Sequence, residues 1–331
     1  MSLDAPLVHR ARELARVAHS DQQRKSGGPY FTHLEAVALL LDECGVRDER
    51  QLAAAYLHDL LEDRPTFEAD LREQMPADVI AICELLTEQK LSREGSPRDK
   101  RLRFAEVVRR LEAGGPLAAL AAPVSCADKI DNVRSLIASE REGQGLLLRL
   151  NTRPGEHRVQ LASLAAVYAD TVNEALLLRF DQARIALLDL LERWLPGRAV
   201  MIAAEAHLGA FDKAGAPYID HPLRLRARAN GDLEKMVAVL HDVVEDSAWT
   251  LEDLGREGFP ELVLRALDHL TRRQGETYDA FIDRVAEDEL ATRIKRLDLE
   301  DNLDPTRVTE PQAADVARAE RYRKALSRLS D

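Results

Sequence analysis

Two hexapeptides in this chain carry the same four polar residues, a His-Asp pair followed by a Glu-Asp pair. Their sequences are HDLLED at residues 58–63 and HDVVED at residues 241–246, and an apolar run precedes each one. Each also comes 20 to 25 residues after the histidine of a Pro-Tyr-x-x-His sequence. A single His-Asp pair is most often a helix cap or a surface ion pair. Two copies in the same larger frame indicate two sites with the same chemistry.

Together with a more distant aspartate, each hexapeptide can supply two imidazoles and two carboxylates to one metal ion. Such a mixed donor set suits a borderline-to-hard divalent ion with more than four ligands, which keeps positions for water. The set lacks the thiolates of a structural zinc site. Because an ion with open positions lowers the pKa of bound water and polarises a phosphoryl oxygen, the pattern indicates metal-dependent hydrolysis. The predicted ligands are His33, His58, Asp59 and Asp128 in the first set and His221, His241, Asp242 and Asp298 in the second.

The Glu-Asp pair that ends each hexapeptide adds two carboxylates close to the predicted ion. Glu62 and Asp63 each lie four residues after one member of the His-Asp pair, and residues at this spacing share one face of a helix. They lie too far along the helix to be expected as ligands. We expect them to orient or deprotonate the attacking water, or to protonate the leaving group. Glu245 and Asp246 repeat the arrangement, so all four are predicted catalytic residues.

The two sets belong to an internal repeat. Matching positions between residues 19 and 33 recur in the second half at a constant offset of 188 residues. Further on, after two shortenings, both halves contain an aspartate that precedes an asparagine by four residues. Polar residues that keep their order while the spacers change length indicate one scaffold used twice. His19 and His207 end a predicted alanine-rich helix in each half, and we expect them to pack against the site rather than to bind metal.

Helical periodicity dominates the sequence and strand-like alternation is scarce, which predicts an all-α protein. A helix over about 49–62 should carry the first His-Asp pair, the glycine-containing stretch 140–155 should be a loop, and Pro196-Gly197 should interrupt the chain. These breaks predict a first domain at 1–180, a helical linker at 181–197 and a shorter second domain at 198–331. The last helix is expected from about Pro311 to Leu329.

Composition limits the partners of the protein. At 331 residues the chain can form two domains, each with its own core. A net charge of −12 argues against a nucleic-acid backbone as partner, although a local basic pocket can still bind a small anion. The three cysteines have no CxxC spacing and are expected to be buried thiols of a reducing cytoplasm. Without an apolar run of 18 residues or a leader sequence, the protein is expected to be cytoplasmic and to have no membrane partner.

The first half resembles the hydrolase domain of the RelA/SpoT family and its small stand-alone relatives, the alarmone hydrolases. The matching blocks are RKSGGPYFTH at 24–33, LHDLLED at 57–63, CADKIDNVRSL at 126–136 and EHRVQ at 156–160. This resemblance covers about residues 7–175. It departs from the family at Leu34, where the family usually has proline, and the departure should alter the start of a helix rather than the chemistry.

The second half is similar to the broader set of small HD-domain phosphohydrolases over about residues 199–304. Its blocks are DKAGAPYIDHP at 212–222, the second hexapeptide, and KRLDLEDN at 295–302. The Arg-Lys pair at 24–25 is replaced here by Asp212-Lys213. If that pair meets a substrate phosphate, the second pocket has lost one cation and gained an anion, so its substrate could differ.

The resemblance implies two tandem all-α HD domains, each with one divalent ion, for which manganese is favoured. The implied activity is that of a guanosine-3′,5′-bis(diphosphate) 3′-pyrophosphohydrolase, which removes pyrophosphate from guanosine tetra- or pentaphosphate with a metal-activated water. The residues expected to face the substrate are Arg24, Lys25, Asn132, Lys213 and Asn302. Two alternatives stay open. The substrate could be another nucleotide or dinucleotide phosphate, or one of the two domains could bind a nucleotide for regulation while the other catalyses.

Overall fold

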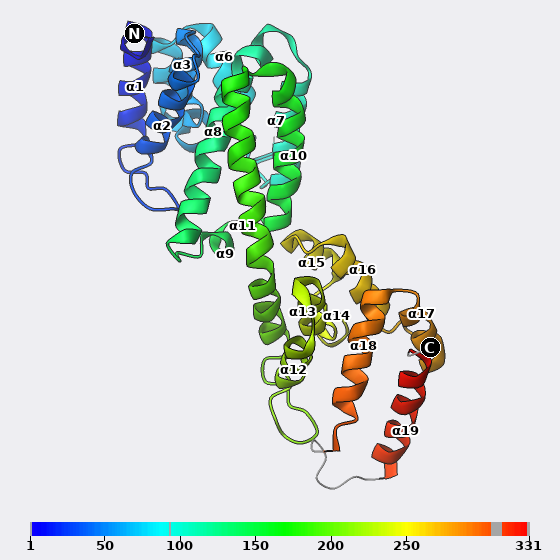
Figure 1. The fold of residues 1–331 in the computed structure, drawn as a ribbon. Coiled ribbons are helices and arrows are strands. Elements are labelled where there is room, and N and C mark those ends of the chain that lie inside the picture. Colours follow the sequence, from blue (N-terminus) through cyan, green and yellow to red (C-terminus); the bar gives the residue numbers. More distant parts are fainter. Residues whose placement is uncertain (1, 93, 306–312, 330–331) are drawn as a thin grey trace. The chain divides into compact units, whose positions relative to one another are not determined.

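The computed structural model describes residues 2–92, 94–305 and 313–329 (Figure 1). Over these residues the regular elements are helices, and β-pairing is limited to isolated bridges such as Gln23–Pro29 and Phe211–Pro217. The all-α prediction is confirmed. The helices in chain order are η1 (Ser2–Asp4), α1 (Pro6–Ala18), α2 (Phe31–Glu43), α3 (Glu49–Leu57), α4 (Leu60–Asp63), η2 (Pro65–Phe67), α5 (Glu68–Gln74), α6 (Ala77–Leu86), α7 (Lys100–Glu112), α8 (Gly115–Arg141), α9 (Leu146–Arg149), α10 (Pro154–Thr171), α11 (Glu174–Ala206), α12 (Asp220–Arg228), α13 (Gly231–Leu240), α14 (Val243–Asp246), α15 (Leu251–Glu257), α16 (Glu261–Leu270), α17 (Tyr278–Ala286), α18 (Glu289–Asn302) and α19 (Ala313–Arg328).

The chain divides into two compact units. The first comprises Met1–Thr152 and His157–Asp189, and the second comprises Arg153–Glu156 and Leu190–Asp331. The division between residues 189 and 190 falls inside the segment 181–197 that was expected to be a linker. The helix expected from about residue 311 corresponds to α19 from Ala313 onward, and residues 311–312 lie outside the described part of the chain.

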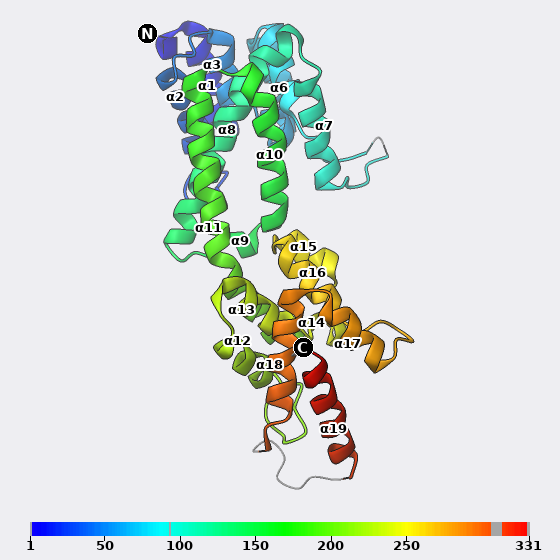
Figure 2. The same cartoon turned by 45° about the vertical axis from the view of Figure 1, so that its right-hand side comes forward.

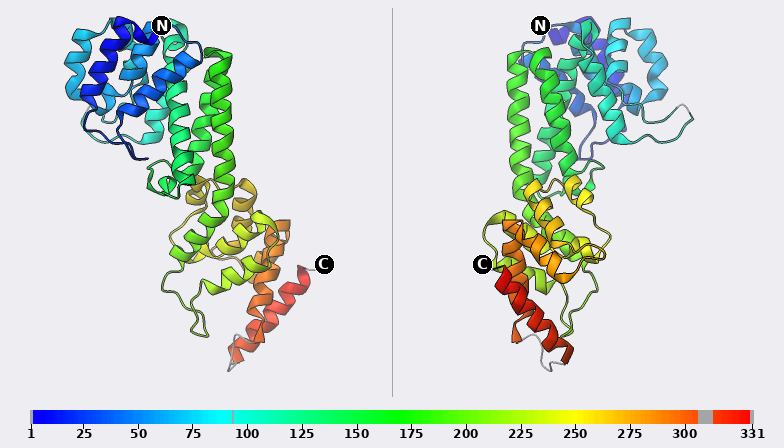
Figure 3. Two further views of the ribbon diagram at one scale, coloured as in Figure 1. Left: turned by 60° about the vertical axis from the view of Figure 1, so that its left-hand side comes forward. Right: turned by 90° about the vertical axis from the view of Figure 1, so that its right-hand side faces the viewer.

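In the first unit, α8 lies at the centre and contacts α2, α3, α6 and α7 (Figure 2). Its buried face is rich in small side chains, including Ala118, Ala121, Ala122 and Ala127, which allow neighbouring helices to approach closely. In the second unit, α18 has the corresponding position and contacts α12, α13, α16, α17 and α19 (Figure 3). The distant aspartate of each predicted metal set lies on this central helix, Asp128 on α8 and Asp298 on α18.

Each His-Asp pair lies at a break between two helices rather than within one. The prediction of a single helix over 49–62 is wrong, because α3 ends at Leu57 and α4 begins at Leu60. The ring Nδ1–H of His58 donates to the carbonyl of Ala55 at 2.9 Å, and that carbonyl would otherwise accept the backbone N–H of Asp59 in a continuing helix. His241 makes the same bond to Ala238 at 2.9 Å, between α13 and α14. The histidine side chain therefore ends the helix that carries it.

Two other predicted breaks differ from the structure. α11 continues through Pro196-Gly197 as one 33-residue helix. A proline removes one helical hydrogen bond, but Leu195, Ala199 and Ile202 on either side are buried in the core of the second unit, and this packing holds the helix together. The stretch expected to be a loop at 140–155 contains the short helix α9. No helix among the described residues is long and apolar enough to cross a membrane.

Candidate metal centres

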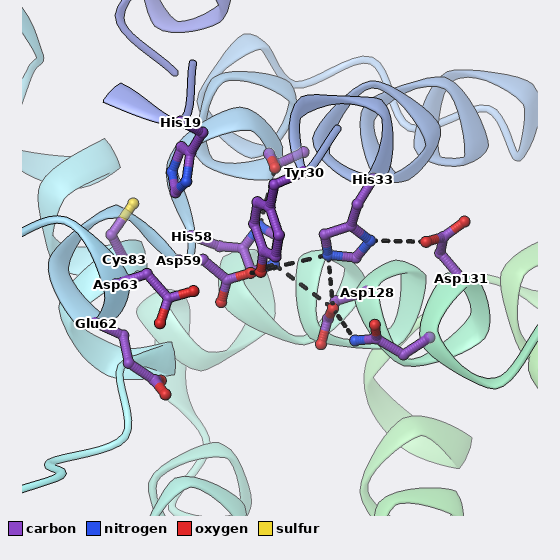
Figure 4. A network of polar contacts seen from close by, with 12 residues as sticks. His19, Tyr30, His33, His58, Asp59, Glu62, Asp63, Cys83, Asp128 and Asp131 are labelled. Atoms are coloured by element: carbon purple, nitrogen blue, oxygen red, sulfur yellow. Dashed lines mark hydrogen bonds and ion pairs between the residues drawn. The ribbon is translucent and has the colours of Figure 1, made fainter. Parts of the chain in front are cut away.

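The four predicted ligands of the first set meet at one point in the first unit (Figure 4). His33 comes from the first turn of α2, His58 and Asp59 from the α3–α4 junction, and Asp128 from α8. One donor atom from each lies within 4.8 Å of all the others. His58 Nε2 is 3.0 Å from Asp59 Oδ2, and His33 Nε2 is 3.2 Å from Asp128 Oδ1. A single ion could therefore contact all four side chains.

Both histidines present the ring nitrogen that a metal needs. Nδ1–H of His33 donates to Asp131 Oδ2 at 2.7 Å, and Nδ1–H of His58 donates to the Ala55 carbonyl. In the neutral ring this leaves Nε2 without a proton and with a free lone pair. Both Nε2 atoms are buried and form no hydrogen bond. A buried, unpaired acceptor is costly, and a bound cation between the two carboxylates would satisfy it, so these residues fit a divalent ion.

The four side chains are strongly coupled electrostatically. Burial lowers the pKa of His58, but Asp59 and Asp128 outweigh it and hold the pKa well above its ordinary value. Burial raises the pKa of Asp128, but His33 and His58 outweigh it and hold the pKa well below its ordinary range. Without a cation, the two carboxylates favour protonation of the imidazoles. A divalent ion would replace those protons, so metal binding should release them.

Two residues that the sequence interpretation left without a role hold predicted ligands in place. Tyr30 donates its hydroxyl to Asp59 Oδ2 at 2.5 Å, and burial together with Asp59 raises the pKa of that tyrosine well above its ordinary value. Asp131 accepts the proton of His33, as described above. Both could have been noticed from the repeat, since each has an identical residue at the corresponding position, Tyr218 and Asp301.

Asn132 was expected to face the substrate. In the structure its Nδ2–H donates to Asp128 Oδ1 at 2.5 Å, so it also orients a predicted ligand. The amide is exposed and lines the adjoining pocket, so contact with a substrate stays a prediction. His19 lies beside Tyr30 with ring centroids 5.1 Å apart, and its Nδ1 bonds Gln22. It is outside the ligand group, as expected for a packing role.

The two predicted catalytic carboxylates border the metal residues in a pocket of about 220 Å³, lined also by His58, Asp59 and Asp128. Asp63 uses both oxygens, since Oδ1 accepts from Lys90 Nζ at 2.7 Å and Oδ2 accepts from Gln22 Nε2 at 2.9 Å. Glu62 accepts the backbone N–H of Glu88 at 3.1 Å. Burial raises the pKa of Glu62, and the negative charge of Asp59 raises it further. The raised pKa suits Glu62 to taking a proton.

A larger pocket of about 400 Å³ adjoins this one, and the two share Tyr30, Lys129 and Asn132 among their lining residues. Four cationic side chains line it, namely Arg24, Lys25, Lys100 and Lys129. Arg24 is not a free cation, because its Nη1–H donates to Asp131 Oδ2 at 2.8 Å and its side chain is 13% exposed. Lys25 is exposed. The predicted metal residues therefore lie beside a pocket lined by four cationic side chains and by the carboxylates of Asp63 and Glu88.

The second unit repeats the arrangement of the first. His241 Nε2 is 2.9 Å from Asp242 Oδ2, and His221 Nε2 is 3.2 Å from Asp298 Oδ1. Tyr218 donates to Asp242 at 2.6 Å, and Asn302 donates to Asp298 at 2.5 Å, as their counterparts do in the first unit. His207 packs near Tyr218 with ring centroids 4.8 Å apart. The corresponding polar contacts thus recur at similar distances.

The second set differs at its distant aspartate. His221, His241 and Asp242 place donor atoms within 4.8 Å of one another, and Asp298 is not part of that tight group. Lys295 Nζ donates to Asp298 Oδ2 at 2.7 Å, and this lysine has Ser125 as its counterpart three residues before Asp128. The Lys295 ammonium group thus donates to one oxygen of a predicted ligand, Asp298 Oδ2. The other oxygen, Oδ1, faces the histidines.

The other predicted residues of the second unit have the following contacts. Glu245 accepts the backbone N–H of Arg272 at 3.3 Å, as Glu62 does from Glu88. Burial raises the pKa of Asp246, and Asp242 raises it further. Lys213 is 71% exposed and lies 3.7 Å from Asp315.

The first unit is similar to a known family. Residues 11–152, less than half of the chain, match the model of a family described as HD domain. The match includes all four predicted ligands of the first site and both predicted catalytic carboxylates.

Curated relatives contain similar segments. The chain is 33% identical over 132 residues to a guanosine-3′,5′-bis(diphosphate) 3′-pyrophosphohydrolase of Aquifex aeolicus, a match that covers 39% of this chain and 18% of that protein. It is 34% identical over 129 residues to the bifunctional (p)ppGpp synthase/hydrolase SpoT of Escherichia coli, with 39% and 18% covered. It is 31% identical over 137 residues to a GTP pyrophosphokinase of Streptomyces coelicolor, with 41% and 16% covered. The chain thus matches less than a fifth of the length of these three relatives.

Proposed function

We propose that the first unit is a metal-dependent phosphohydrolase that removes pyrophosphate from the 3′ position of guanosine tetra- or pentaphosphate. One observation carries the proposal. The predicted metal residues open onto a pocket of about 400 Å³ lined by Arg24, Lys25, Lys100 and Lys129. A cavity of this size suits a nucleotide, and its cations suit a substrate with two diphosphate groups. The names of two of the relatives above support the same substrate.

Manganese is the ion we propose, with one in each unit held by the two histidines and two aspartates. When bound, the ion supplies charge for the phosphoryl oxygens and an acidified water. Tyr30 and Asn132 hold the carboxylates of Asp59 and Asp128 in position. Glu62, whose pKa is raised by burial, takes the proton of the attacking water. Water adds to the phosphorus attached to the 3′ oxygen, the phosphorus–oxygen bond breaks, and the proton reaches the 3′ oxygen, which gives pyrophosphate and guanosine diphosphate from the tetraphosphate.

The direct test uses the full-length chain with manganese and guanosine tetraphosphate. We expect guanosine diphosphate and pyrophosphate in equal amounts, and no turnover of guanosine triphosphate, which has no 3′ diphosphate. The His58→Ala chain, which lacks a ligand of the first site, should lose this activity. Release of single phosphates, or activity that survives His58→Ala unchanged, would refute the proposal for the first unit.

A second candidate function concerns the second unit, which we propose acts on a less anionic phosphate ester or binds a nucleotide for regulation. Asp212 replaces Arg24 at the matching loop position. The residue after the distant aspartate is Lys129 in the first unit and the buried Leu299 in the second. Both changes remove a cation. A panel of nucleotide substrates given to the His58→Ala and His241→Ala chains would separate the two sites. Equal rates of guanosine tetraphosphate hydrolysis by the two variant chains would contradict the proposed difference between the two units.

A further inference from the structure

A carboxylate that is at least partly buried accepts the Nδ1 proton of the first histidine in both sites. In the first unit, Asp131 Oδ2 lies 2.7 Å from His33 Nδ1, and Asp131 is 17% exposed (Figure 4). In the second unit, Asp301 Oδ2 lies 2.7 Å from His221 Nδ1, and Asp301 is 6% exposed. Each carboxylate lies three residues after the distant aspartate, on the next turn of the central helix. Neither is a predicted ligand.

An arginine holds this carboxylate in both units, but the two arginines come from different elements. Arg24, in the loop before α2, donates through Nη1 to Asp131 at 2.8 Å. Arg224, within α12, donates through Nε and Nη2 to the two oxygens of Asp301 at 2.8 and 3.0 Å. The position that matches Arg24 in the repeat is Asp212. The loop arginine of one unit is thus replaced by a helix arginine in the other.

The position that matches Arg224 is Ala36, three residues after His33 on α2. Each unit therefore keeps one arginine on the carboxylate and has a residue that cannot donate at the other position. Two different solutions to one contact indicate that the contact, rather than either arginine position, is what the fold requires. In the first unit Arg24 also donates through Nη2 to Asn132 at 3.3 Å, and Asn132 holds Asp128. Arg24 thus contacts both Asp131, which bonds His33, and Asn132, which bonds Asp128.

We infer that Asp131 and Asp301 are positioning residues that orient His33 and His221 for metal binding, and that Arg24 and Arg224 hold these carboxylates in place. The inference rests on the proposed metal chemistry. The carboxylate keeps the ring proton on Nδ1, so Nε2 stays available to the ion, and the negative charge makes that nitrogen a better donor. The arginine compensates the negative charge of the carboxylate in this largely buried position. Its hydrogen bonds also fix the orientation of the carboxylate group.

The test measures manganese binding by calorimetry in full-length chains that carry His241→Ala, so that only the first site is titrated. Arg24→Ala should weaken manganese binding by about 10- to 100-fold, the usual effect of losing a partner behind a metal ligand. Adding Ala36→Arg to Arg24→Ala should restore most of the affinity, because it supplies the arginine from the helix position that the second unit uses. Arg12→Ala is the matched control, since Arg12 forms an ion pair with Glu35 of the same helix α2. It should leave the affinity unchanged.

The outcomes separate this inference from the proposed function. If the His241→Ala chain binds no manganese, the proposed metal chemistry fails, whatever the arginines do. If it binds manganese and Arg24→Ala binds equally tightly, the positioning role is refuted. Loss of affinity that Ala36→Arg does not restore would also refute the equivalence of the two arginines. Thermal unfolding of each variant identifies a chain that has lost its fold, and Arg224→Ala, measured in a His58→Ala chain, repeats the test on the second site.

Discussion

Replacement of Glu62 by glutamine tests the chemical step in the first unit most directly. The substitution is nearly isosteric and can keep the contact in which Oε2 accepts the Glu88 N–H at 3.1 Å. It leaves the four predicted ligands in place and removes the ability to take a proton, together with the ion pair between Glu62 Oε1 and Lys90 Nζ at 3.3 Å. A lost general base costs about a hundredfold or more in turnover, or about 2.7 kcal/mol in the activation barrier.

The structure also predicts a smaller effect for the neighbouring carboxylate. Both oxygens of Asp63 already accept hydrogen bonds, from Lys90 Nζ at 2.7 Å and from Gln22 Nε2 at 2.9 Å, so neither oxygen is free to take the proton of a water. Burial and the charge of Asp59 raise the pKa of Glu62. We therefore expect Asp63→Asn to reduce turnover less than Glu62→Gln does.

The assay is the initial rate of pyrophosphate release from guanosine tetraphosphate at saturating manganese, with the bound metal measured in the same samples. Glu84→Gln is the matched control, since Glu84 is a surface residue on α6 paired with Arg72. Its turnover should equal that of the unmodified chain. A Glu62→Gln chain that retains its metal and its full rate would remove Glu62 from the mechanism and leave Asp63 as the base.

Three further predictions concern the metal, pH and the substrate. Metal analysis should find two ions per chain and one in His58→Ala, and one ion in the unmodified chain would show that one site binds no metal. In the chelator-treated protein, Asp298 and Asp301 outweigh burial and raise the pKa of His221 from 6.5 to about 9, so its protonated form stabilises the fold below pH 6.5 and this contribution is lost as the pH rises toward 9. The melting temperature should fall over that range, and a flat profile would argue against the charged pair. In Arg24→Ala with Ala36→Arg, metal binding is restored without the loop arginine, so a raised KM for guanosine tetraphosphate would assign substrate contact to Arg24 and an unchanged KM would exclude it.

Much of the first site could be predicted from residue type and spacing. His33, His58, Asp59 and Asp128 were identified because each has an equivalent in the second half, and their donor atoms do converge. Helical periodicity identified the fold class because apolar residues must line the buried face of each helix. The helix boundaries were less predictable. The helix breaks at His58 because the histidine side chain donates to the Ala55 carbonyl in place of a backbone N–H. Hydrophobic periodicity carries no information about such a hydrogen bond.

The sequence by itself determined which residues are repeated, and therefore which side chains are available to bind an ion in each half. Only the tertiary structure decided how they are held. Arg24 and Asp131 are 107 residues apart, and Arg224 and Asp301 are 77 apart, so no local pattern links either pair. By position alone Arg24 corresponds to Asp212, which suggested the loss of a cation. Packing of α12 against α18 brings Arg224 to the same carboxylate from another direction, because contacts depend on where side chains end in space and not on their order in the chain.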